Sequence, residues 1–182
     1  MKRFMLFAVV AVMMTFVARG AFAQYSGPVY ATAETFAEIV SGVTIMNAPN
    51  SSLNFGVIYQ PTAGSVQATV NPENGLTNGT AKWADRMRAH PAEFKIIGPG
   101  GYSVRVNLPR DSYVLDGPGG ATMMVYDFKS YPNSPSPDVG AQVFLDATGE
   151  GTIKVGATLE VNNAQAIGQY YNPDALRIQI NF

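Results

Sequence analysis

Apolar and polar residues alternate along much of the chain, in short runs separated by glycine, proline and asparagine. The closing stretch ALRIQINF, residues 175–182, has an apolar residue at every second position. A period of two is the pattern of a half-buried β-strand, with one face on a core and the other in water. A terminal strand of this kind needs a pairing partner, which could be this chain, a neighbouring subunit or a membrane barrel.

Runs of similar character recur along the chain before the closing one. They cover residues 29–40, 52–58, 65–71, 92–97, 102–108, 112–115, 122–128, 141–146 and 152–161. Short strands at this spacing, with turn signals between them, are typical of all-β sandwiches and barrels. No segment shows a sustained helical period. We therefore predict an all-β fold, an antiparallel β-sandwich that forms a single domain.

The phase of each run predicts which side chains face the core. The residues expected to be buried are Phe55, Val104, Val106, Leu159, Ile178 and Ile180. We expect residues 152–161 and the closing strand to form a hairpin joined at residues 162–168, so that the last strand pairs inside its own domain. Intermolecular pairing is then expected at the other end. The predicted donor strand there presents Val29, Ala31, Ala33, Ala37 and Ile39 on one face.

Glycine and proline mark the turns between the runs. The stretch GPGG occurs at residues 98–101 and again at residues 117–120, each time directly before a predicted strand. Glycine supplies the positive φ of tight turns, whereas a phosphate-binding loop would need a helix after it. Residues 131–140, YPNSPSPDVG, hold too many prolines for a helix or a central strand. We predict turns at both glycine-rich sites and a surface loop at residues 131–140.

The first residues have the features of a secretory signal. Lys2 and Arg3 give a positive start, residues 6–18 are apolar, and AFA at residues 21–23 has the form of a cleavage site. The apolar run is shorter than the roughly 20 residues that span a bilayer, which argues against an uncleaved anchor. We expect residues 1–23 to be a cleaved signal peptide and residues 24–182 to be the sandwich domain, exported to the periplasm, the cell surface or the medium.

Composition narrows the class of protein further. The chain has no cysteine, so an exported form has no disulfide framework and no cysteine for a lipid anchor. Its formal net charge is −1 and becomes more negative once the basic signal is removed. This mild charge gives no electrostatic reason to expect a nucleic acid or anionic lipid partner. We also expect no transmembrane segment in the mature chain.

One stretch, KWADRMRAHP at residues 82–91, differs from its surroundings because it holds the single tryptophan and the single histidine. Trp83, Arg86 and Met87 have the spacing of one helical turn, which Pro91 would end. Lys82, Trp83, Arg86 and Arg88 are therefore a candidate contact loop for a sugar, a base or a lipid headgroup. The alternative is a short solvated helix whose tryptophan closes one end of the sandwich.

Catalytic patterns are scarce in this sequence. Without cysteine and with His90 alone, one chain cannot assemble the usual zinc sets or a cysteine nucleophile. Glu34 and Glu38 would lie about 13 Å apart on a strand, farther than the carboxylates of glycosidases. The stretch DATGEG at residues 146–151 offers oxygen ligands, but calcium gathers about six to eight, so a solvated turn is the alternative. We expect a non-enzymatic protein without a cofactor.

Four stretches in order resemble a known family. They are LNFG at residues 53–56, GSVQATVNPENG at residues 64–75, AEFKIIGPGGYSVRVNLP at residues 92–109 and LDATGEGTIKVGATLEVNNAQAIGQY at residues 145–170. With the closing RIQINF, they resemble the bacterial secreted family called domain of unknown function 4402. The resemblance implies an exported immunoglobulin-like β-sandwich without an established activity.

The chain is also distantly similar to spore-coat-U-like pilins of archaic chaperone–usher systems, which carry FG after their first strands and end in an alternating strand. The chain departs from them by lacking their cysteine pair, and residues 82–91 do not fit the family pattern. The resemblance implies copies of the chain or related surface subunits as partners, with a periplasmic chaperone and an usher.

These observations lead to three hypotheses about function. We favour a structural subunit of a surface filament or matrix that assembles by β-strand addition. The alternative is a self-complete secreted binding or adhesion module that makes contacts through residues 82–91 or 131–140. A third hypothesis is a small outer-membrane β-barrel, because such proteins also end in an alternating strand. Most runs are shorter than the roughly 9 to 11 residues that barrel strands need.

Overall fold

The computed structural model of the chain describes residue 34 and residues 36–49, 52–133 and 140–181. The chain divides into two units, Met1–Glu38 and Ile39–Phe182. In the second unit the described residues form β-strands and one short 3-10 helix, η1. None of the described residues belongs to a helix long and apolar enough to span a bilayer. The prediction of an all-β fold is confirmed.

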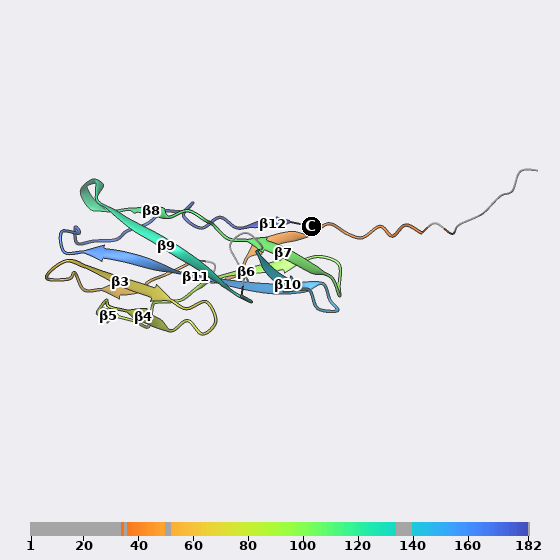
Figure 1. The fold of residues 1–182 in the computed structure, drawn as a ribbon, viewed down its shortest axis with the longest axis horizontal. Helices are drawn as coiled ribbons and strands as arrows, with labels where there is room; N and C mark the ends of the chain where they lie inside the picture. Colours follow the sequence, from red (N-terminus) through yellow and green to blue (C-terminus); the bar gives the residue numbers. More distant parts are fainter. Residues whose placement is uncertain (1–33, 35, 50–51, 134–139, 182) are drawn as a thin grey trace, which may run out of the picture. The chain divides into compact units, whose positions relative to one another are not determined.

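The strands are short, except for two near the end of the chain (Figure 1). In order they are β1 (Thr44–Asn47), β2 (Val57–Ile58), β3 (Ser65–Val70), β4 (Thr77–Gly79), β5 (Trp83–Asp85), β6 (Ala92–Ile97), β7 (Ser103–Asn107), β8 (Tyr113–Asp116), η1 (Pro118–Gly120), β9 (Thr122–Tyr131), β10 (Ala141–Phe144), β11 (Glu150–Asn162) and β12 (Gln179–Asn181).

Strand β11 is the centre of the larger sheet. Lys154 pairs with β6 and also with β9, and Thr158 pairs with β3 and also with β9. Because a strand has two edges, β6 and β3 follow one another along one edge of β11 and β9 occupies the other. Strands β1, β4 and β8 extend the sheet beyond β6, β3 and β9, and every pairing is antiparallel. One strand thus joins all parts of this sheet.

Two smaller sheets cover the inward face of β11. The sheet β10-β7-β12 packs with Ile153 and Val155 in a first core cluster, and β2-β5 packs with Leu159 and Val161 in a second. These residues occupy alternate positions of β11 and therefore point to the same side of the sheet. Phe128 of β9 packs against both clusters. The architecture is an antiparallel β-sandwich whose second layer consists of two separate sheets.

Most of the predicted core is confirmed. Phe55, Val104, Val106 and Leu159 are buried. Ile178 and Ile180, however, are only half-buried, although they have the predicted phase and pack against the first cluster. They lie in or next to β12, which is the last strand of its sheet, so one side of each is not covered by a neighbouring strand. The prediction that they are buried is wrong for this reason.

The last strand pairs inside its own domain, as predicted, but the predicted hairpin is wrong. Strand β12 pairs with β7 and not with β11. The connection first crosses the β8–β9 turn, where Tyr171 and Asp116 exchange two backbone hydrogen bonds. Buried Gln165 fixes this crossing, because its amide nitrogen donates to the carbonyl oxygen of Thr122 and to the hydroxyl of Tyr170, each over 2.8 Å. These contacts carry the chain across to the other layer.

The beginning of the domain also differs from expectation. The described part of the predicted strand at residues 29–40, namely residue 34 and residues 36–40, belongs to no strand, and the remaining residues lie outside the described ones. The first strand among the described residues is β1 instead, and β4 and β5 were not predicted either. Each of these three has only three or four residues, too few for an alternation to be recognised. They form because β6, β3 and β2 offer edges for pairing.

The predicted turns are confirmed at both GPGG sites. Gly101 has a φ of 79° just before β7, and Gly119 and Gly120 have φ values of 65° and 79° just before β9. A residue with a Cβ atom rarely adopts this left-handed conformation, which explains glycine at these positions. In the predicted loop at residues 131–140, Tyr131 is still part of β9, and residues 134–139 lie outside the described residues.

Candidate interaction surfaces

Residues 36–42, which we call the pre-β1 segment, are exposed throughout and belong to no strand or helix. Phe36 is 85% exposed and Ile39 98%, and Val40 is exposed as well. Single exposed apolar residues are normal, but three within five positions of the sequence are a local concentration of exposed apolar side chains. Of the predicted donor residues, Ala37 and Ile39 lie here, on alternate positions. Val29, Ala31 and Ala33 lie outside the described residues.

Strands β1 and β12 each end a sheet. Strand β1 pairs with β6, and the hydrogen bond from the Ala48 nitrogen to the Glu93 oxygen continues this ladder. Because bonded and non-bonded positions alternate in antiparallel pairs, the backbone groups of Ile45 and Asn47 point away from β6. Strand β12 pairs with β7 alone in the described part of the chain. Both edges border the first core cluster, against which Ile45, Ile178 and Ile180 pack.

The outer edge of β8, in contrast, is covered by its own chain. The amide nitrogen of Asn172 donates a 2.7 Å hydrogen bond to the carbonyl oxygen of Val114, and Tyr171 pairs with Asp116 through the backbone. These contacts occupy edge groups that another strand would otherwise use. Alternation cannot predict this role of Asn172, because asparagine before proline indicates only a turn.

Residues 82–91 form a strand and a turn rather than the predicted helix. Trp83 and Asp85 belong to β5, and the following turn closes with a 3.0 Å hydrogen bond from the nitrogen of Ala89 to the oxygen of Arg86. The carboxylate of Asp85 accepts a hydrogen bond from the nitrogen of Met87, a local contact that competes with helix formation. With β2 available for pairing and Pro91 close behind, the segment is too short to nucleate a helix.

The turn still brings the predicted contact residues together. The guanidinium carbon of Arg86 lies 4.8 Å from the ring centroid of Trp83, and Arg88 forms an exposed 3.0 Å ion pair with Asp85. Lys82 is exposed beside them, and Met87 at the tip is 94% exposed. These residues, Lys82, Trp83, Arg86, Met87 and Arg88, are called the hairpin tip below. It combines cationic groups with apolar surface.

His90 has a structural position next to the hairpin tip. Its backbone exchanges two hydrogen bonds with Asn54, of 2.9 and 3.0 Å. Its ring Nδ1 lies 3.2 Å from the carbonyl oxygen of Pro91. His90 therefore forms an isolated bridge between two chain segments.

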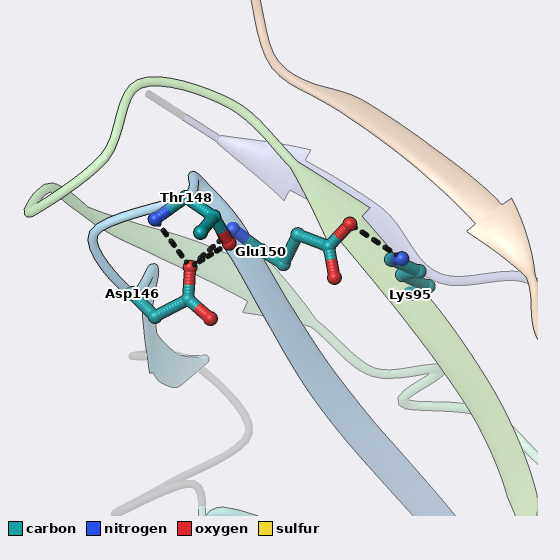
Figure 2. Close-up of polar contacts among 4 residues, drawn as sticks. All are labelled: Lys95, Asp146, Thr148 and Glu150. Carbon is teal, nitrogen blue, oxygen red and sulfur yellow. Dashed lines mark hydrogen bonds and ion pairs between the residues drawn. The ribbon is translucent and has the colours of Figure 1, made fainter.

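The turn between β10 and β11 uses Asp146 as its organising group (Figure 2). One carboxylate oxygen of Asp146 accepts hydrogen bonds from the nitrogen and hydroxyl of Thr148 and from the nitrogen of Glu150. The hydroxyl of Thr148, followed by the backbone N–H of Glu150, lowers the pKa of this carboxyl below its ordinary value. Glu150 forms a 2.6 Å ion pair with Lys95 of β6. In the described residues, no group of three or more acidic or histidine side chains could hold a metal ion.

Comparison with known proteins places the sandwich in a family. Neither a curated protein nor a solved structure matches the chain. A family model described as a domain of unknown function (DUF4402) matches residues 44–181, from the first residue of β1 to the last residue of β12. The pre-β1 segment lies outside this match. The match covers most of the chain, and the protein therefore belongs to the DUF4402 family.

Proposed function

We propose that the protein is a non-enzymatic, exported structural subunit of a surface filament or matrix, and that its copies assemble by β-strand addition. The observation that carries this proposal is the pre-β1 segment. Its apolar residues Phe36, Ile39 and Val40 are exposed, it forms no strand, and it precedes the part of the chain that belongs to the family fold. An apolar segment of this kind gains burial when it joins the sheet of a partner.

Strand addition needs a donor and an acceptor, and the described residues offer both. The donor supplies backbone hydrogen bonds along its length, while alternate side chains enter the partner's core. Strand edges without a neighbour, such as those of β1 and β12, are templates for this pairing. An exported chain with such edges needs protection before assembly, which is the role expected of a periplasmic chaperone and an usher.

Deletion of residues 24–42, with residues 1–23 kept for export, tests the proposal. In the described part of the chain the strands begin at Thr44, so we expect the shortened protein to fold and to remain monomeric. The intact protein should form oligomers or filaments, seen by sedimentation and by electron microscopy of material sheared from cells. A free peptide of residues 24–42 should block growth of the intact protein. An intact protein that stays monomeric at high concentration contradicts the proposal.

A second candidate function rests on the hairpin tip. Arg86 stacked on Trp83, with Lys82 and Arg88 beside them, suits an acidic polysaccharide, because cations attract its charges and an aromatic face suits a sugar ring. Such a protein would be a monomeric adhesion module. Retention on immobilised heparin, lost in Lys82→Ala, Arg86→Ala and Arg88→Ala combined, supports this function. Equal retention of the variant and the parent contradicts it.

A further inference from the structure

We propose that the acceptor for assembly is the outer edge of residues 176–181, which are β12 and the three residues before it, in a second copy of this chain, where the pre-β1 segment adds as a new strand. This inference rests on the proposed function and specifies its partner and its site. The strand that occupies this edge comes from another copy of the same chain.

The apolar residues of the donor alternate in the same way as the half-buried apolar residues of the acceptor. Leu176, Ile178 and Ile180 occupy alternate positions at the end of the chain and pack, half-buried, against the first core cluster. In the pre-β1 segment, Ala37 and Ile39 also occupy alternate positions and are exposed. A strand added beside β12 with this face inward would cover the open side of the cluster and bury both rows together.

The opposite face of the same pair is complementary in charge. Glu38 is exposed, and Arg177 lies on the outward face of the acceptor. Arg177 is 80% exposed, and its ion pair with the equally exposed Asp174 is long, at 3.8 Å. It can therefore turn to a new carboxylate at little cost. Arg105, which pairs with Asn181 across β7 and β12, adds a second exposed cation near this edge.

Charge and burial select the same register. If Glu38 lies opposite Arg177, then Ala37 and Ile39 lie opposite Leu176 and Ile178. This holds whether the added strand runs parallel or antiparallel to the acceptor, because the two apolar residues flank Glu38 and the two acceptor residues flank Arg177. A shift by one position would instead turn Ala37 and Ile39 to water and place Glu38 in the core together with Phe36 and Val40.

The other edges suit this donor less well. The edge of β8 is covered by Tyr171 and Asn172. At β1, the nearest cation on β6 is Lys95, which already forms a 2.6 Å ion pair with Glu150. Of the β1 and β12 edges, β12 is thus the one with a largely exposed cation beside it.

Charge reversal provides the first test. Glu38→Arg and Arg177→Glu should each reduce the sedimenting fraction of purified protein several-fold, because like charges then face each other. An equimolar mixture of these two variants should recover assembly, since each donor meets an opposite charge on the other variant. Arg88→Glu, a charge reversal at the hairpin tip, is the control and should assemble like the parent.

Cysteine cross-linking is a second test that does not depend on charge, and the cysteine-free chain makes it selective. Mixed Glu38→Cys and Arg177→Cys proteins should form a disulfide-linked dimer under mild oxidation, because opposed residues in a sheet lie close enough to bridge. Glu38→Cys mixed with Arg88→Cys should not. If both charge-reversal variants assemble like the parent and the cysteine variants form no cross-linked dimer, the β12 edge is not the acceptor. Strand addition at another edge would then still be compatible with the results. A parent that never assembles overturns the proposed function itself.

Discussion

The indole nitrogen of Trp83 donates a 2.9 Å hydrogen bond to the carbonyl oxygen of Phe55 and so joins β5 to the chain segment before β2. Phe55 is buried in the second core cluster, and Trp83 packs against that cluster. Gly56 follows in a left-handed conformation with a φ of 78°, and a Cβ atom there would lie 2.6 Å from the oxygen of Asp85. In addition to its backbone pairing, the two-stranded sheet β2-β5 is therefore stabilised by one side-chain hydrogen bond and one close backbone approach.

Trp83→Phe tests this hydrogen bond. The variant keeps an aromatic ring in the cluster but removes the N–H donor, so we expect a loss of about 1 kcal/mol in the free energy of unfolding. Urea denaturation followed by tyrosine fluorescence or circular dichroism measures it. The control Arg86→Ala removes only the exposed stacking partner and should cost about 0.5 kcal/mol or less. A variant as stable as the parent would show that water replaces the bond without loss.

Truncation of core side chains to alanine should cost more free energy of unfolding at fully buried positions than at half-buried ones. Leu159→Ala removes a buried side chain from the second cluster and should cost about 2 to 5 kcal/mol, through lost burial and the cavity left behind. Ile180→Ala acts at the half-buried edge strand β12 and should cost less in the monomeric protein. Denaturation midpoints of the two variants give the comparison. An equal loss for both would mean that β12 is covered in solution.

Gly156 in β11 has no room for a side chain. A Cβ atom there would lie 2.1 Å from the carbonyl oxygen of Val70 and 2.9 Å from the ring of Pro72. Gly156→Ala should therefore destabilise the fold by about 1 to 3 kcal/mol or more. Gly42→Ala is the matched control, because nothing lies within 4 Å of its Cβ position. Thermal unfolding of both proteins should show a lower Tm only for the β11 variant.

The Asp146 turn predicts a pH dependence of stability. Hydrogen bonds from Thr148 and Glu150 lower the pKa of the Asp146 carboxyl below 3.8, so its charged form stabilises the folded state. This contribution is present above pH 3.8 and is lost as the pH falls through the lowered pKa. We expect the Tm difference between the parent and Asp146→Asn to be constant near neutral pH and to disappear in strong acid. A difference that stays the same at all pH values would show that the charge is irrelevant.

The alternation of apolar and polar residues predicts which face of a strand is buried much better than it predicts which strand pairs with which. Residues 92–97 were predicted as a strand and coincide with β6, whose inward residues are buried. The same pattern could not identify β7 as the partner of β12, because any neighbouring strand satisfies the alternation. The pairing is determined by the connection from β11 to β12, which crosses the β8–β9 turn. This crossing depends on the hydrogen bonds of Gln165 with Thr122 and with Tyr170.

The candidate surfaces were predictable to different degrees. The contact of Arg86 with Trp83 was predicted from helical spacing, and it is present although a turn produces it. Of the predicted donor residues, Ala37 and Ile39 are among the described residues and are exposed, whereas the exposed Phe36 and Val40 lie on the other phase and were not predicted. The open edge of β12 could not be predicted from the sequence. An alternating pattern shows that a segment forms a strand, but it does not show whether a second strand lies beside it.

The central position of β11 also sets the order in which the chain can fold. Strands β3, β6 and β9 are made earlier, yet each of them pairs with residues 150–162. Thr69 and Thr158, for example, share a 2.8 Å hydrogen bond across 89 positions of sequence. Contacts so distant make folding slow, because a long loop must close before they form. During synthesis the earlier strands therefore remain without their common neighbour, and the sheet is complete only after β11 has been made.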